Sequence, residues 1–195
     1  MSDELKWDSR YRGATPEGAE PARVLAEFAY LLPHHGSALD LACGLGGNAL
    51  FLASRGLEVS AWDISSVAIG KLQTAAERRG VSVMAQVRDV VATPPEPEHY
   101  DVIVVSRFLE RGLMPAILAA LRPGGLLFYQ TFIRARVHDI GPSCSAYRLD
   151  CNELLSLCGG LQVLVYREEG RVGDTEQGMR DEAMLIGQRA VDLIA

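Results

Sequence analysis

The sequence predicts a doubly wound α/β fold, with a mostly parallel, Rossmann-like sheet, helices on both faces and an antiparallel edge strand near the C-terminus. Two observations carry this prediction. Strand-like and helical segments alternate along most of the chain, as they do in parallel β-α-β units. Residues 101–105 form an almost continuous apolar run, which is typical of a strand buried on both faces of a sheet.

The expected elements follow one another closely from the N-terminus. An arm carries Trp7 and Tyr11, and a helix with apolar residues at helical spacing runs from Pro21 until Pro33 stops it. The first strand, residues 37–42, leads directly into glycines and a helix that ends near residue 55. Further strands are expected at residues 57–62, 81–87, 101–105, from a turn at 122–125 through 131, at 162–166 and at 183–188.

Helices are expected between most of these strands. Ser65 or Ser66 caps a helix that Gly80 ends. Two more helices are expected at residues 113–121 and near residues 152–157. No helical pattern separates the last two strands, so we expect them to pair antiparallel at one edge of the sheet.

Length and composition predict one domain over residues 1–195, in which residues 1–16 are an N-terminal arm or lid. The net charge of −6 argues against a surface devoted to nucleic acid, which requires a basic face. The four cysteines show no metal-ligand spacing, so we expect free thiols in a reducing compartment and no metal site. The polar N-terminus and the lack of a long apolar run predict a cytoplasmic protein that does not enter a membrane. Monomer and dimer both stay open.

The segment at residues 39–48, Leu-Asp-Leu-Ala-Cys-Gly-Leu-Gly-Gly-Asn, is the most informative part of the sequence. A strand that runs into Gly44-x-Gly46 and opens a helix lets a ligand approach backbone that has no Cβ. The glycines alone are ambiguous, because Gly44-x-Gly46-x-x-Ala49 also fits the dinucleotide-binding fingerprint.

Three acidic residues at the ends of three successive strands favour a different ligand. Asp40 suits the cationic amino end of an amino-acid cofactor. Asp63 follows Gly44 by nineteen residues and is placed to accept both hydroxyls of a ribose. Asp89 is placed to accept from an adenine amino group while Val90 packs on the ring. Such an acidic cup fits a net-cationic nucleoside better than a polyanionic dinucleotide.

These segments resemble class I S-adenosylmethionine (SAM)-dependent methyltransferases. The resemblance rests on residues 39–48, on Trp62-Asp-Ile-Ser65, Asp89, Tyr100-Asp-Val-Ile-Val and Leu121-Arg-Pro-Gly-Gly125. Within that class, Trp7-Asp-x-Arg-Tyr11, Gly-Gly-Asn48 and Tyr129-Gln-Thr-Phe132 are similar to the tellurite-resistance-protein-B-like branch. Members of that branch often carry a His before the last strand, where this chain has Glu176-Gln-Gly.

The resemblance implies SAM as the cofactor and methyl transfer to a small-molecule acceptor as the reaction. It places Asp40, Gly44 and Gly46 around the methionine portion of SAM, and Ser106 and Arg107 facing the methyl group. The expected cofactor-binding residues are Asp40, Ala42, Cys43, Gly44, Gly46, Asn48, Asp63, Ile64, Asp89, Val90, Ser106 and Arg107.

The catalytic residues stay open at the level of sequence. Arg107 and Tyr129 are the candidates, and His138 and Glu110 are further residues considered as a base. Residues 101–148 contain six arginines and three acids, an excess that predicts an anion-attracting mouth. The alternative, that these arginines are solvated surface residues with no role in binding, has equal weight. An anion-attracting mouth suits an anionic or soft acceptor, such as a thiol or a selenium or tellurium oxyanion.

Two other functions compete with this interpretation. One is a non-catalytic SAM-binding sensor or partner subunit, because the cofactor cup is clearer than the acceptor site. The other is an NAD(P)-dependent oxidoreductase. The short-chain form of that class requires Tyr-x-x-x-Lys, and none of the six tyrosines has Lys four residues later. Methylation of DNA bases is disfavoured because Ser106-Arg-Phe replaces the Asn/Asp-Pro-Pro-aromatic motif.

Overall fold

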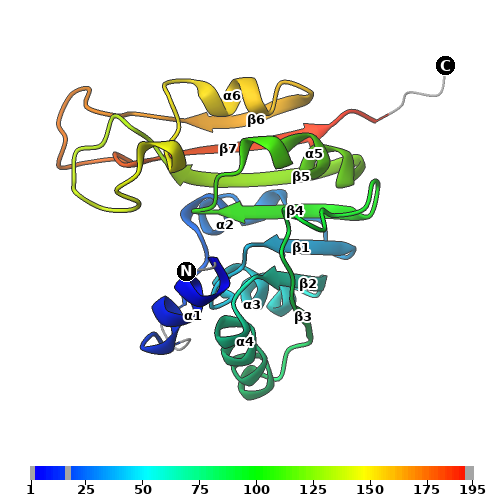
Figure 1. Cartoon of the computed structure of the whole chain (residues 1–195). Helices are drawn as coiled ribbons and strands as arrows, with labels where there is room; N and C mark the ends of the chain where they lie inside the picture. Colours follow the sequence, from blue (N-terminus) through cyan, green and yellow to red (C-terminus); the bar gives the residue numbers. More distant parts are fainter. Residues whose placement is uncertain (1–2, 16–18, 192–195) are drawn as a thin grey trace.

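The computed structural model describes residues 3–15 and 19–191, which are built around a seven-stranded sheet in the order β3-β2-β1-β4-β5-β7-β6 (Figure 1). Strands β1 to β5 are parallel, and β7 runs antiparallel to both β5 and β6. The strands are β1 (Ser37–Leu41), β2 (Glu58–Asp63), β3 (Val83–Val87), β4 (Tyr100–Ser106), β5 (Leu121–Phe132), β6 (Leu161–Arg167) and β7 (Glu182–Arg189). The predicted doubly wound fold is confirmed, and the reversed strand β7 lies one position inside the edge strand β6.

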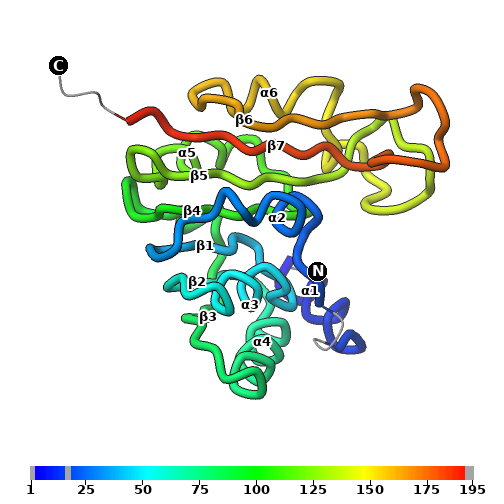
Figure 2. Tube along the Cα trace, turned by 180° about the vertical axis from the view of Figure 1, so that it is seen from behind, coloured from blue at the N-terminus to red at the C-terminus, as the bar shows by residue number. Residues whose placement is uncertain are grey.

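Helices cover both faces of the sheet (Figures 1 and 2). The helices are α1 (Asp3–Arg12), α2 (Arg23–Glu27), α3 (Gly47–Ser54), α4 (Ser66–Arg79), α5 (Met114–Ala120) and α6 (Glu153–Leu157), with short 3-10 turns η2 (Ala29–Leu31), η3 (Arg111–Leu113) and η4 (Ser145–Tyr147). Alternate residues of β1 point to opposite faces, so Ala38 packs in the core beneath α2, α3 and α4, while Leu39 packs beneath α5 and α6.

The caps predicted for the helix after β2 are confirmed. The Ser65 hydroxyl accepts a hydrogen bond from the backbone N–H of Ala68, and Gly80 ends α4 with a φ of 64°. A glycine adopts this left-handed conformation without a steric penalty. The Ser65 cap lies where the amino-terminal end of α4 follows the carboxyl end of β2, beside the glycine loop.

Two boundaries differ from the prediction. The helix expected from residue 21 to 32 is divided into α2 and the single 3-10 turn η2. The turn expected at residues 122–125 lies within β5, where the register passes from Tyr100↔Leu121 directly to Val102↔Leu126. The glycines of that segment therefore bulge out of a strand that pairs on either side of them.

Candidate cofactor and acceptor site

The loop after β1 has the backbone geometry expected of a ligand cradle. Ala42, Gly44 and Gly46 all have positive φ, at 56°, 53° and 78°. The two glycines serve different purposes. A Cβ on Gly46 would lie 2.2 Å from Leu72 Cδ1, so α4 packs directly on this position. A Cβ on Gly44 would lie 2.7 Å from the Tyr11 hydroxyl, which comes from the N-terminal arm.

Asp40 is fully buried beneath this loop. Its carboxylate accepts hydrogen bonds from Asn48 Nδ2 (3.2 Å) and from the backbone N–H of Ala49 (3.0 Å), in the first turn of α3. Burial raises the pKa of Asp40 to about 7, although these two hydrogen bonds oppose the shift. The carboxyl group is thus poised to become ionised when a positive charge approaches it.

Asp63 joins two neighbouring loops at the end of β2. Its carboxylate accepts from the backbone N–H groups of Gly44 (2.8 Å) and Ser65 (2.9 Å). The side chain is buried, and this burial raises its pKa above the usual range. Asp40, Asp63 and the glycine loop therefore meet in one place, as the sequence predicts for three features at the carboxyl ends of adjacent parallel strands.

The third acid is placed differently. Asp89 is exposed and accepts from the backbone N–H groups of Val91 and Ala92, which is the role of a cap on the turn that follows. Val90 is buried in the core cluster that contains Trp62. Ile64 is half-buried between Asp63 and Ser65, and Cys43 is buried in the loop itself.

The N-terminal helix α1 packs against α4. It lies at the end of the sheet toward which the arrowhead of β4 points, which is the side of the glycine loop (Figure 1). Asp8 accepts from the Ser65 hydroxyl (2.6 Å), from the Ser66 hydroxyl and from the Val67 backbone N–H. Lys71 donates to backbone carbonyls at the end of α1, including that of Tyr11 (2.7 Å). These contacts place Tyr11 over Gly44, and burial, with Asp63 nearby, raises the pKa of its hydroxyl.

A chain of hydrogen bonds leads from this loop to the end of β4. Asn48 Nδ2 donates both to Asp40 and to the Ser106 hydroxyl (3.0 Å). Asn48 Oδ1 accepts from the backbone N–H of Ala22 (2.8 Å), which fixes the segment before α2. Asn48 and Ser106, both predicted as site residues, are therefore brought together.

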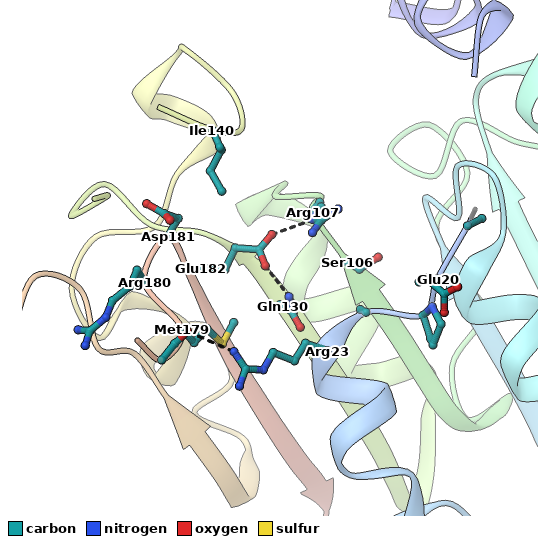
Figure 3. A pocket seen from close by; sticks show the side chains of 14 residues that line it. Glu20, Arg23, Ser106, Arg107, Gln130, Ile140, Met179, Arg180, Asp181 and Glu182 are labelled. Atoms are coloured by element: carbon teal, nitrogen blue, oxygen red, sulfur yellow. Dashed lines mark hydrogen bonds and ion pairs between the residues drawn. The ribbon is translucent and has the colours of Figure 1, made fainter. Parts of the chain in front are cut away.

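Ser106 also borders a cavity of about 570 Å³ at the carboxyl ends of β4 and β5. The cavity is lined by residues 19–23, Ser106, Arg107, Gln130, Ile140 and residues 178–182 (Figure 3). Its volume is that of an ordinary small-molecule site. The position agrees with the rule that ligands of doubly wound sheets bind at the carboxyl ends of the strands.

Arg107 is the second predicted site residue, after Ser106, that lines this cavity. Its φ of 55° is unusual for a residue with a Cβ, and such conformations cluster at functional sites. Its Nε donates to Glu182 Oε1 (2.8 Å), and the side chain is 67% exposed. Within residues 3–15 and 19–191, the two terminal nitrogens of Arg107 have no hydrogen-bond partner.

The remaining arginines of the predicted anion-attracting mouth are already engaged. Arg148 is buried and donates to the carbonyls of Pro142, Ile133 and Ile140. The other four form the ion pairs Arg111–Glu153, Arg122–Asp101, Arg134–Asp150 and Arg136–Asp139. Of the six arginines, Arg107 is the one that lines the cavity.

The other catalytic candidates lie outside the cavity lining. Tyr129 is fully buried under α5, donates its hydroxyl to the carbonyl of Phe108, and has its pKa raised by burial. Glu110 caps η3 by accepting from Gly112. His138 Nδ1 contacts Asp181 Oδ2 at 2.7 Å. The structure does not bring Tyr129 to the site, because the side chains of β5 alternate between the two faces.

Two site residues escaped sequence reasoning. Gln130 donates to Glu182 Oε2 and accepts, through Oε1, from the backbone N–H of Val24 (2.8 Å). Gln130 stands inside the Tyr-Gln-Thr-Phe segment that carries part of the resemblance, and Glu182 precedes the apolar run Ala-Met-Leu-Ile. A charged residue at the start of a buried strand is the signal that marks Glu182.

Two other features are absent from the described part of the chain. Residues 3–15 and 19–191 contain no group of three or more His, Cys, Asp or Glu residues arranged to hold a metal ion. In the same residues no helix is long and apolar enough to cross a membrane.

Comparison with known proteins gives the class to which this fold and site correspond. Residues 38–125 match the "Methyltransferase domain" family. Hemagglutinin 1 of Eikenella corrodens is 40% identical over 94 residues, which are 45% of this chain and 31% of that protein. The probable SAM-dependent methyltransferase TehB of Haemophilus influenzae is 33% identical over 87 residues, 43% of this chain and 30% of TehB. The matched part thus spans about a third of the length of these relatives.

Solved structures extend the likeness to nearly the whole fold. TehB from H. influenzae superimposes with a TM-score of 0.70 at 21% identity and covers 95% of this chain and 66% of the TehB chain. A protein studied for conversion of a disulfide bond into a thioacetal group during echinomycin biosynthesis superimposes with a TM-score of 0.72 at 22% identity, over 99% and 95% of the two chains. The chain thus resembles class I SAM-dependent methyltransferases over residues 38–125, and its fold resembles that of TehB, as the sequence motifs predict.

Proposed function

We propose that this protein transfers the methyl group of SAM to a small acceptor that is anionic or soft, such as a thiol or a selenium or tellurium oxyanion. The observation that carries the proposal is the continuity of the site. Asn48 bonds Asp40 on the cofactor side and Ser106 on the acceptor side, so the cup and the cavity of about 570 Å³ are adjacent.

The residues of the cup fit SAM. Asp40 and Asp63 supply two buried carboxylates of raised pKa, which a cationic ligand stabilises in their ionised form. We assign Asp40 to the amino end of the methionine portion, Asp63 to the ribose, and the Asp89–Val90 pair to the adenine. Ala42, Cys43, Gly44, Gly46 and Ile64 complete the assignment through the backbone of the two loops.

We further propose that α1 is a lid. Tyr11 rests on Gly44, in the space that a ligand approaching the loop backbone uses, so cofactor entry requires α1 to shift. The contacts that hold α1 include several polar ones: no residue of the helix is fully buried, and Asp8 and Lys71 provide hydrogen bonds between α1 and α4. A helix held by a few polar contacts opens at a lower cost than one packed in the core.

Bound SAM supplies an electrophilic methyl group on a positively charged sulfur. The protein contributes alignment, because in-line displacement requires the nucleophile, the methyl group and the sulfur to lie on one line. Arg107 holds the anionic part of the acceptor through its terminal nitrogens, and Ser106 fixes the boundary between the two ligands. A thiolate or a selenium or tellurium nucleophile needs little help from a base.

Two further assignments accompany this function. The net charge of −6 and the dimensions of the cavity favour a small molecule over nucleic acid as the acceptor. All four cysteines are free, the state expected in a reducing compartment, which supports a cytoplasmic location.

The test has two stages. Thermal-shift measurements with SAM, S-adenosylhomocysteine and NAD(P) should give a shift with the first two ligands alone, because a ligand that binds the native state stabilises it. Incubation with SAM and tellurite, selenite or small thiols should then produce S-adenosylhomocysteine. A shift with NAD(P) but not SAM refutes the cofactor assignment. Binding of SAM with no turnover of any acceptor favours the sensor alternative.

A further inference from the structure

We propose that Glu182 is a positioning residue for the acceptor: it holds Arg107 by Nε so that the two terminal nitrogens of the guanidinium face the cavity. This inference rests on the proposed function and assigns a role to a residue outside the motifs of the fold. It also narrows the acceptor to molecules with one small anionic group.

The geometry of Glu182 limits what it does. Its carboxylate is buried at the start of β7 and lies between Arg107 and Gln130 (Figure 3). Oε1 accepts from Arg107 Nε at 2.8 Å, and Oε2 accepts from Gln130 Nε2. Both oxygens are thus engaged from opposite sides, which fixes the plane of the carboxylate.

Gln130 is itself fixed from behind. Its Oε1 accepts from the backbone N–H of Val24 (2.8 Å), so the orientation of the amide is determined and Nε2 must face Glu182. A row of three polar side chains therefore runs from the buried start of α2 to the exposed guanidinium of Arg107. The Arg107 end of this row reaches the cavity with two terminal nitrogens that have no hydrogen-bond partner among the described residues.

The contact through Nε matters for recognition. Arginine has five N–H donors in a rigid planar fork, and a carboxylate that takes the Nε donor leaves the terminal nitrogens for a second anion. The left-handed backbone at Arg107, with a φ of 55°, starts the side chain in a direction that Glu182 then maintains. Without Glu182 an exposed arginine samples many rotamers, and binding an anion requires ordering it.

Charge balance decides which anion fits. Among the residues lining the cavity, three arginines (23, 107 and 180) face three acids (Glu20, Asp181 and Glu182). Arg180 donates to the carbonyls of Gly170 and Val172, and Arg23 pairs with Glu27. A highly charged ligand meets no net positive field there, whereas one compact anionic group meets the Arg107 fork.

The first measurement is calorimetric titration of selenite into the protein saturated with S-adenosylhomocysteine. We expect Glu182→Gln to weaken selenite binding about tenfold and Arg107→Ala to weaken it further but measurably, with the affinity for S-adenosylhomocysteine unchanged in both variants. The double variant should bind no worse than Arg107→Ala alone, because Glu182 acts through Arg107. Glu98→Gln is the matched control: it breaks the exposed Arg189–Glu98 pair and should leave selenite binding unchanged.

Three outcomes overturn the proposal. Selenite that does not bind the wild-type protein leaves Glu182 with nothing to position, even if SAM is turned over with a neutral thiol. Equal selenite affinity in Glu182→Gln and wild type shows that Arg107 needs no support. Additive losses of selenite affinity in the double variant show that Glu182 acts independently of Arg107. The same conclusion follows if Glu182→Gln abolishes turnover of a thiol and Arg107→Ala retains it. Failure of SAM to bind refutes the proposed function instead.

Discussion

Asp40 is expected to make both stability and cofactor binding depend on pH. Its carboxyl group has an ordinary pKa of 3.8, and burial raises the pKa to about 7 in the folded protein. A difference of about 3 pH units corresponds to about 4 kcal/mol against the ionised form. The native state therefore holds a proton on Asp40 that the unfolded chain releases at lower pH.

The sign of both effects follows from this raised pKa. Stability from Asp40 is fully present below about pH 4 and is lost as the pH rises toward 7, with no further loss above that pH. A cationic amino group beside Asp40 favours the ionised form, so binding releases a proton below pH 7. Affinity for S-adenosylhomocysteine is then expected to rise by up to about tenfold per pH unit as the pH approaches 7, and to level off above it.

The measurement compares wild type with Asp40→Asn, which has nearly the same shape and cannot ionise. Urea unfolding and calorimetric titration of S-adenosylhomocysteine at pH 5, 6, 7 and 8 give both quantities for each protein. The two proteins differ at Asp40 alone, so the difference between their pH profiles reports the contribution of this residue. Identical pH profiles for the two proteins would refute the assignment of Asp40 to the cationic end of the cofactor.

Three further predictions concern the same site. Asp63→Ala is expected to weaken SAM binding ten- to a hundredfold and to lower stability by about 1–3 kcal/mol, because two backbone N–H groups lose their acceptor; unchanged SAM affinity in a folded variant contradicts the ribose contact. Gly46→Ala is expected to cost about 1–3 kcal/mol of stability, measured by chemical unfolding, because a Cβ would lie 2.2 Å from Leu72; a loss below 0.5 kcal/mol (roughly the effect of a neutral surface change) contradicts this packing. Asp8→Ala is expected to accelerate SAM association in stopped-flow experiments and tryptic cleavage near Arg10; unchanged rates of both contradict the lid.

Much of the fold was predictable because its signals are local. The alternation of strands and helices, the apolar strand β4, the Ser65 and Gly80 caps and the glycine loop are all encoded within a few residues of one another. The meeting of Asp40 and Asp63 also followed from sequence, because the ends of adjacent parallel strands lie at one edge of a sheet. Where the prediction was less accurate, as at residues 122–125, pairing with β4 overrode the local turn preference.

The proposed acceptor site depended on tertiary structure. Sequence determined that Arg107 follows β4. Its partner Glu182 is 75 residues away, on β7, which runs antiparallel to β5. The predicted excess of arginines became a set of ion pairs once distant acids folded against them, and Tyr129 faced the core because of the register of β5. Tyr11 reached Gly44 only because Asp8 and Lys71 attach α1 to α4. Local propensity and spacing specify elements and the loops that directly follow them, whereas side-chain partners across the sheet are set by packing of the complete chain.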